Sequence, residues 1–301
     1  MSAAPPLQAT QPVDAEPERS GLRRFFDWWL AFLRHHRPAL VGFLLSSMIL
    51  LIAGLGPLVL EHAPDAVFGR FEPAGSEHLL GTDSQGYDVW SRIVAGGRVT
   101  LWIALSSMLL SLTLGTIAGA AAGYLGGWVD LLVMRGVDFA MSFPSFLLAM
   151  VTIAILGAKL ENVVLAVGLV GAPIFARQVR AEVLRVKTNE YVTAARALGF
   201  GNLRILLRHV LPNCFAPIVV LGTLTMGSAI LDVAGLNFLG LGGDPYTTPE
   251  WGLILKQGWE KRPYGNLQVT VAGLAIFLTV LGFNLLGDGL KDELDPRTRR
   301  R

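Results

Sequence analysis

Six long apolar stretches, separated by polar or charged segments, constrain the fold of this chain more than any other feature. An α-helix needs about 20 predominantly apolar residues to cross the hydrocarbon core of a bilayer. The candidate membrane spans lie at residues 38–60, 99–125, 137–157, 163–176, 214–230 and 269–286. The sequence therefore predicts an all-α polytopic membrane protein with about six transmembrane helices. Pro144 and Pro173 predict kinks in the third and fourth spans.

Composition agrees with that prediction. Of the 301 residues, 52% are hydrophobic and 16% are charged, whereas soluble domains carry about 25% charged residues. The single cysteine, Cys214, excludes an internal disulfide and a cysteine metal cluster. It stands at the start of a predicted span, where we expect it to be a small buried apolar residue.

The segments around the spans complete the predicted organisation. Residues 1–20 are rich in Ala, Pro, Gln and Glu, which predicts a disordered tail. Residues 21–37 repeat apolar and aromatic side chains every three to four positions among arginines, a pattern typical of an amphipathic helix in the membrane interface. Residues 61–98 follow the first span, and a basic segment at 290–301 ends the chain.

The distribution of lysine and arginine predicts the orientation in the membrane. Segments on one side of the predicted spans hold 18 of the 25 Lys and Arg residues. By the positive-inside rule, both termini are cytoplasmic and residues 61–98 are external. The transmembrane core, residues 99–289, then contains residues 188–213 as a cytoplasmic segment and residues 233–266 as an external loop.

The cytoplasmic segment 188–213 has the pattern of a helix, a glycine break and a second helix. Good helix formers fill residues 194–198, and Gly199 then ends the run as a C-cap glycine does. Asn202 is expected to cap a short helix at 203–210, which Pro212 would end. The pattern predicts a polar knob on the membrane surface that a soluble partner can grip.

The same segment resembles the cytoplasmic signature of bacterial ABC importer permeases. That signature reads Glu-Ala-Ala, three residues, Gly, nine residues, Ile, any residue, Leu-Pro. The matching positions here are Thr193, Ala194, Ala195, Gly199, His209, Leu211 and Pro212. Thr193 replaces the signature Glu and His209 replaces the Ile, so no role of a carboxylate is carried over to Thr193.

Four further stretches, at 79–101, 123–149, 238–252 and 275–297, resemble the dipeptide/oligopeptide/nickel branch of these permeases, and within it the second of the two permease subunits. The resemblance implies the type I importer permease fold with a cytoplasmic coupling helix, in the bacterial inner membrane. It implies as partners a second permease, two cytoplasmic ATPase subunits or domains, and an extracytoplasmic substrate-binding protein. ATP and Mg²⁺ would bind to the ATPases, so no cofactor is expected on this chain.

The resemblance also implies a function and a site. The chain would translocate peptides, with nickel or another small solute as the alternative, when ATP-driven closure of the ATPases presses on the knob. The candidate ATPase-coupling residues are Tyr191, Thr193, Ala194, Ala195, Arg196, Leu198, Gly199, Phe200, Leu203 and Arg204.

Three other groups of residues carry hypotheses. Gly115, Gly119 and Gly123 share one helix face and predict close helix packing, either within this chain or against a second permease. Asp138 follows Arg135 by three residues, which predicts an ion pair on one helix. A binding-protein docking surface or external gate is a hypothesis for Asp232, Asp244, Tyr246, Glu250 and Trp251, and surface helices with aromatic anchors are the alternative.

Other classes of protein lack support in the sequence. It contains no Gly-x4-Gly-Lys-Ser/Thr phosphate loop, no His-Glu-x-x-His metal motif and no Gly-x-Ser-x-Gly nucleophile motif. We therefore expect no catalytic residue, no metal site and no nucleic-acid partner. An intramembrane enzyme would need a nucleophile–base pair within the spans, and none is apparent in the sequence. A channel would conduct ions without the ATPases, so transport by proteoliposomes of this chain alone would distinguish a channel from an importer subunit.

The missing phosphate loop generates a direct prediction. The purified chain should neither bind nor hydrolyse ATP, which equilibrium binding of a fluorescent ATP analogue and a phosphate-release assay will measure. The same assays on the chain copurified with its ATPases serve as the positive control. Nucleotide binding by the isolated chain at micromolar concentration would contradict the assignment to a transport subunit.

Overall fold

The computed structural model describes residues 29, 32–33, 36–244 and 246–294. The tail predicted at 1–20 and most of the amphipathic helix predicted at 21–37 lie outside the described residues, as does the last part of the basic C-terminus. The chain divides into two units, Met1–Arg37 and Pro38–Arg301. The architecture below is that of the second unit.

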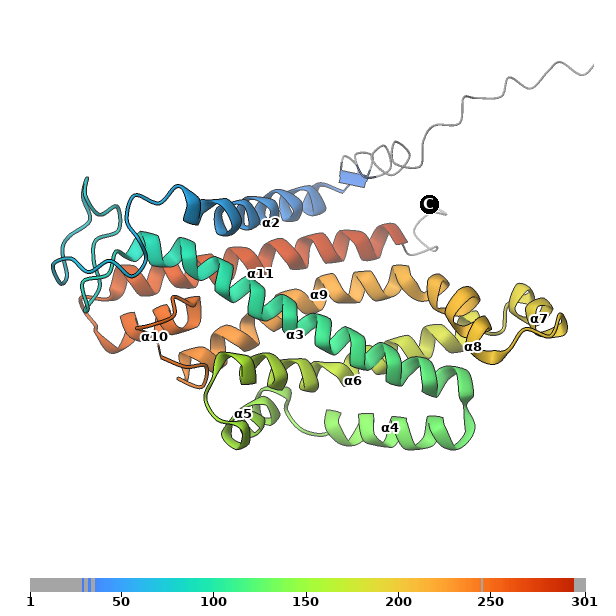
Figure 1. Cartoon of the computed structure of the whole chain (residues 1–301). Helices are drawn as coiled ribbons and strands as arrows, with labels where there is room; N and C mark the ends of the chain where they lie inside the picture. The colour runs from blue at the N-terminus through green and yellow to red at the C-terminus, as the bar shows by residue number, and fades with distance from the viewer. Residues whose placement is uncertain (1–28, 30–31, 34–35, 245, 295–301) are drawn as a thin grey trace, which may run out of the picture. The chain divides into compact units, whose positions relative to one another are not determined.

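Helices make up almost all of the regular structure in the part of the chain that is described (Figure 1). Five of these helices are long and apolar enough to cross a membrane, and a bent helix pair makes a sixth span if it is counted as one. The prediction of about six transmembrane helices is therefore confirmed. In chain order the elements are α2 (Arg37–Leu55), η1 (Gly56–Leu58), α3 (Val89–Leu125), α4 (Gly127–Met141), α5 (Ser145–Leu156), α6 (Leu160–Val186), α7 (Glu190–Ala197), α8 (Asn202–Ile205), η2 (Leu206–Val210), α9 (Leu211–Phe238), α10 (Trp251–Glu260) and α11 (Asn266–Leu294).

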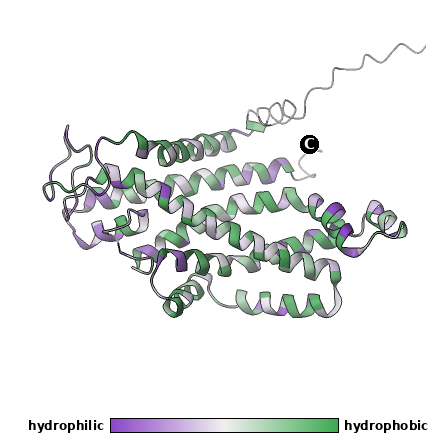
Figure 2. Cartoon of the chain, in the orientation of Figure 1, coloured by the Kyte–Doolittle hydropathy of each residue, from purple (hydrophilic) through white to green (hydrophobic). Residues whose placement is uncertain are grey.

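The long helices run side by side, and polar residues gather at the two ends of the bundle (Figure 2). One end carries α7 and α8, and the other carries α10 and the loops at 59–88 (Figure 1). We call these the α7 end and the α10 end. The middle of the bundle, where the spans are green in Figure 2, is the part that suits the hydrocarbon core.

The glycines of α3 bring its backbone against α6. A methyl group at Gly115 or Gly119 would overlap backbone atoms of α6, and one at Gly123 would lie 3.0 Å from the Arg180 carbonyl oxygen. Lipid tails are as apolar as leucine, so helices in a bilayer gain association energy mainly from such close packing. This face of α3 is covered by α6 of the same chain.

The third predicted span differs from the prediction. A break at Ser142–Pro144 divides it into α4 and α5, which meet at an angle of 93°. Proline lacks a backbone N–H and disfavours the helical conformation in the residue before it, so the helix cannot continue through Pro144. Residues 137–157 are therefore not one straight helix, and α4 begins ten residues before the predicted start, at Gly127.

Ion pairs between neighbouring helices hold α4 beside α6. Arg180 Nη2 donates to Asp130 Oδ2 over 2.7 Å, and Arg177 Nη2 donates to Asp138 Oδ1 over 2.8 Å. The predicted pairing of Asp138 with Arg135 is therefore wrong. Spacing along the sequence indicates only partners on the same helix, whereas the arginine that pairs with Asp138 lies on α6.

Several helices extend beyond the predicted spans. The fourth span continues through Pro173 to Val186, and α3 begins at Val89, where the Asp88 side chain accepts a hydrogen bond from the Ser91 backbone N–H. Pro212 was predicted to end a helix, but it lies in the first turn of α9, where its missing N–H is not needed. The chain therefore stays helical from Asn202 to Phe238. Likewise α11 runs from Asn266 to Leu294, beyond both ends of the span predicted at 269–286.

Orientation in the membrane can be tested with single cysteines in a Cys214→Ser background. Ser76→Cys and Asp244→Cys lie at exposed positions of the α10 end, and Gly201→Cys lies at an exposed position beside α7. We expect an impermeant thiol reagent to label the first two in intact cells and to label Gly201→Cys only after permeabilisation. External labelling of Gly201→Cys in intact cells would overturn the orientation.

Candidate functional site

The α7 end carries a compact turn that fixes the shape of the knob. Gly199 has a φ of +81°, a left-handed conformation that favours glycine. The Phe200 backbone N–H donates to the Ala195 carbonyl over 3.2 Å, and the Gly199 N–H donates to the Arg196 carbonyl over 3.0 Å. These are the two bonds of a Schellman motif, as the sequence pattern of this segment indicates.

The side chains of the knob divide into a buried set and an exposed set. Val192 and Ala195 are buried in an apolar cluster with residues such as Val183 of α6 and Cys214 of α9, and Ala195 is only 5% exposed. Ala195 was predicted to contact an ATPase, but its burial makes it a packing residue. Helical period places it three residues after Val192, on the face toward the bundle. The other predicted coupling residues are exposed, apart from the half-buried Phe200: Tyr191, Thr193, Ala194, Arg196, Leu198, Gly199, Leu203 and Arg204.

Large apolar side chains project from the exposed face of the knob. Leu198 is 75% exposed, Leu203 is 69% exposed and Leu207 is also exposed. Leucines this exposed at a polar end of the bundle make this face a candidate surface for contact with another protein. Leu207 was not among the predicted residues, although it lies one helical turn after Leu203 and shares its face.

Contacts with the bundle hold the knob in place. The Arg204 guanidinium lies 4.8 Å from the Phe200 ring centroid, and that ring stacks on His209 at 6.0 Å. Asn202 does not cap α8 as predicted, because the residue at the N-cap position is Gly201 and the Asn202 side chain accepts a hydrogen bond from the Tyr124 hydroxyl over 3.3 Å. Lys187 Nζ donates to the carbonyl oxygen of Gly123 over 2.6 Å. Displacing the knob must therefore also displace the ends of α3 and α6.

A buried carboxyl organises the α10 end. Glu250 is 0% exposed and accepts hydrogen bonds from the Thr100 hydroxyl at 2.8 Å and from the Leu253 backbone N–H at 3.0 Å. The Trp251 indole N–H donates to the Ile93 carbonyl over 2.8 Å. Burial raises the pKa of the Glu250 carboxyl, although its hydrogen bonds act in the opposite direction. These contacts attach α10 to α3.

A second polar group, which sequence reasoning missed, fixes the loops at this end. The Asp83 carboxylate accepts from Gln257 Nε2 at 3.0 Å and from the backbone N–H of Tyr87 at 3.0 Å. Buried His78 lies 2.9 Å from Asp88 through its Nδ1 atom. Because Gln257 lies 174 residues from Asp83 in the sequence, no local pattern could have indicated this contact.

The five residues predicted as a docking surface or gate do not form one surface. Asp244 and Tyr246 are exposed in the loop before α10, whereas Glu250 and Trp251 are buried. The prediction of a docking role is therefore wrong for Glu250 and Trp251, because a partner cannot reach them. Asp232 lies half-buried within α9, away from that loop in sequence.

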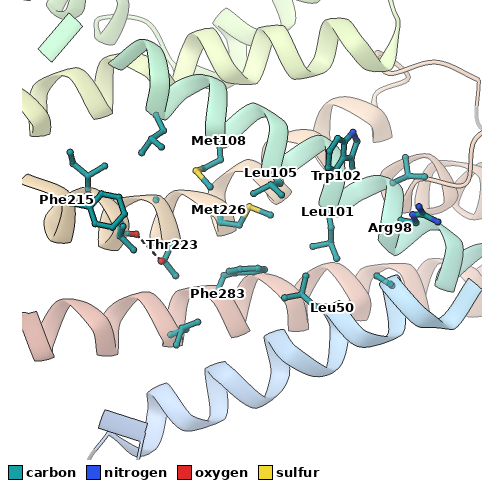
Figure 3. Close-up of a pocket in the computed structure, with 18 residues that line it drawn as sticks. Leu50, Arg98, Leu101, Trp102, Leu105, Met108, Phe215, Thr223, Met226 and Phe283 are labelled. Atoms are coloured by element: carbon teal, nitrogen blue, oxygen red, sulfur yellow. Dashed lines mark hydrogen bonds between the residues drawn. The ribbon is translucent and has the colours of Figure 1, made fainter. Parts of the chain in front are cut away.

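A large apolar cavity lies between α2, α3, α9 and α11 (Figure 3). Its volume is about 1000 Å³. Arg98 lies at one end of the cavity and Phe215 at the other, with methionine and leucine side chains between them (Figure 3). Within the described ranges, no group of three or more His, Cys, Asp or Glu residues is arranged to hold a metal ion.

Comparison with protein-family models gives one family over most of the chain. Residues 111–300 match the binding-protein-dependent transport system inner membrane component family. The match begins within α3 and contains the later helices through α11, the knob and the loop before α10.

Curated relatives cover nearly the whole chain. The dipeptide transport system permease protein DppC of Alkalihalophilus pseudofirmus is 39% identical over 98% of both chains. The di/tripeptide transport system permease protein DppC of Pseudomonas aeruginosa is 41% identical over 91% of this chain and 92% of its own. The glutathione transport system permease protein GsiD of Pectobacterium atrosepticum is 39% identical over 97% of both.

Among solved structures, the chain resembles one from the MetNI methionine ABC transporter in an inward-facing conformation. The TM-score is 0.51 at 20% sequence identity, over 66% of this chain and 96% of that chain. At this identity the likeness concerns the fold alone, and it is the fold of a type I ABC importer permease.

Burial of Glu250 generates a prediction on pH. The pKa of the Glu250 carboxyl is higher in the folded chain than in the unfolded chain. The protonated carboxyl therefore makes its full contribution to stability below the unfolded-state pKa of about 4.3. This contribution is lost as the pH rises through the folded-state pKa. Glu250→Gln removes this titration. Thermal unfolding midpoints in detergent, measured between about pH 4 and pH 8, should therefore fall for the unmodified chain relative to Glu250→Gln as the pH rises.

Glu260→Gln is the matched control, because Glu260 is the last residue of the helix that Glu250 caps and its side chain is exposed. The unfolding midpoint of that variant should change with pH as the midpoint of the unmodified chain does. If the unfolding midpoints of the unmodified chain and of Glu250→Gln change with pH in the same way, Glu250 does not titrate with a raised pKa.

Proposed function

The chain belongs to the family of binding-protein-dependent transport system inner membrane components, and on that premise we propose how it works within a complete importer. It is a multi-pass permease subunit of an ABC importer rather than an enzyme. The observation that carries the proposal is the identity of 39% over 98% of the chain to a dipeptide permease, combined with an exposed leucine surface on the knob.

The proposed solutes are short peptides. The names of the relatives describe dipeptide, di/tripeptide and glutathione transport. These names favour peptides over nickel, the alternative within the same branch. In such an importer the chain pairs with a second permease, and an extracytoplasmic binding protein delivers the peptide.

The knob is the proposed contact with the ATPases. Its exposed leucines, Leu198, Leu203 and Leu207, supply apolar area, and exposed Arg196 and Arg204 supply charge at the edge. An apolar centre with a polar rim is the usual composition of a protein interface. The proposed orientation, with the knob and both termini in the cytoplasm, places this surface on the side where ATP is available.

Force at the knob has a continuous path to the other end of the bundle. The helix from Asn202 to Phe238 has 37 residues, which is about 55 Å at 1.5 Å per residue. At its far end Gly252 of α10 packs directly on the backbone of Ala234. We infer that ATP-driven closure moves this helix, and that α10 and its buried Glu250 move with it as the pathway opens to alternate sides.

The proposal predicts the effect of removing the leucines. The double variant Leu198→Ser with Leu203→Ser should lose most ATPase association, because each buried leucine contributes about 1.5–3 kcal/mol, or roughly tenfold to a hundredfold in affinity. Gly199→Val should weaken association as well, because a β-branched residue is strained at a φ of +81°. The measurements are ATPase copurification and uptake of a radiolabelled dipeptide.

Arg196→Ala is the control within the same surface, because an exposed charge contributes little once it is screened. All variants must insert into the membrane at normal abundance. Normal copurification and uptake in the double leucine variant would show that the knob is not where the ATPases bind.

A further inference from the structure

We propose that the cavity between α2, α3, α9 and α11 holds an acyl chain of a phospholipid whose phosphate binds Arg98. The cavity has a volume of about 1000 Å³ and lies within the bundle beside the bilayer-spanning part of α3 (Figure 3). This inference depends on the membrane location of the chain and not on which solute it carries.

Arg98 is the charged residue among those that line the cavity. Its side chain is exposed, and within the described part of the chain it makes no hydrogen bond or ion pair. Arg98 directly precedes the predicted span 99–125, and a long cationic side chain at such a position extends to the membrane interface, where an anionic headgroup can bind it. Its positive charge therefore favours an anionic group at this end of the cavity.

The position of Arg98 along α3 matches the headgroup region. Thr100, two residues further on, bonds to Glu250 in the loops of the α10 end. Trp102, one turn from Arg98, is 69% exposed and also lines the cavity. Tryptophan prefers the membrane–water interface. Arg98 thus lies at the depth where a bilayer places its phosphates, on the leaflet that faces the α10 end.

The rest of the lining fits a hydrocarbon chain and not a peptide. Besides Arg98, the lining side chains that can donate a hydrogen bond are those of Trp102 and Thr223, and the Thr223 hydroxyl already donates to the Val219 carbonyl over 3.0 Å. A peptide in this cavity would bury backbone amides without partners, which is unfavourable. An acyl chain needs no partners.

The length of the cavity also suits a lipid. Its lining on α3 runs from Arg98 to Leu112, which is about 21 Å at 1.5 Å per residue. Half of a hydrocarbon core is about 15 Å. An acyl chain that starts at Arg98 therefore has room to extend to the middle of the bilayer without leaving the cavity.

The test is phospholipid retention by the importer complex, purified in mild detergent, washed, and measured by native mass spectrometry. The unmodified complex should retain a phospholipid, and added phosphatidylglycerol should restore it after delipidation. Arg98→Gln should retain at least about tenfold less, the loss expected for a charge-assisted hydrogen bond. Gly222→Phe should also lose it, because a side chain at Gly222 enters the cavity with only Met108 nearby, at 3.7 Å.

Arg135→Gln is the matched control, since Arg135 is an exposed arginine of α4 that does not line the cavity. It should retain the lipid in full. A photo-crosslinking amino acid at position 102 should attach to phospholipid. Crosslinks to the second permease or to an imported peptide would overturn the proposal, and so would an unmodified complex without retained lipid or equal retention by Arg98→Gln.

Discussion

Backbone-to-backbone packing of α3 on α6 is the contact on which the rest of this bundle depends. Helices in lipid gain little from leaving the surrounding hydrocarbon, so close approach must supply the association energy. Gly115, Gly119 and Gly123 allow that approach along three turns of α3. The knob then rests on the same two helices, through the apolar cluster around Val183 and the bond from Lys187 to Gly123.

The α10 end is held by a different kind of interaction. There the chain leaves the bilayer, and buried polar groups such as Glu250, Asp83 and Gln257 join segments far apart in sequence. Buried hydrogen bonds of this kind favour one arrangement of the segments that they join, because a buried polar group that loses its partner is costly. The bundle thus combines apolar packing between its spans with polar connections at one end, and its two ends are linked by the long helix that contains α9.

The sequence predicts the spans and the knob well, because both depend on local composition. Apolar length identifies the membrane helices, and Gly199 followed by a basic helix identifies the turn of the knob. Predictions that depended on tertiary contacts were less successful. Nothing in the spacing around Asp138 points to Arg177 on another helix, and nothing around Ala195 or Glu250 shows that each is covered by distant residues. Pro212 was misread for a related reason, since proline is tolerated in a first helical turn as well as after a last one.

The helical run from Asn202 to Phe238, which is formed by α8, the π-helical turn η2 and α9, has a consequence for how this segment can vary among relatives. It carries Leu203 of the knob near one end and Met226 of the cavity further along. Between these two residues lies the π-helical turn η2, so only the α-helical parts on either side of it turn by about 100° for each residue. One residue inserted into or deleted from α9 between η2 and Met226 would turn the leucines by about 100° relative to the cavity unless the π-helical turn absorbed the change. A substitution leaves the number of residues, and with it this angle, unchanged.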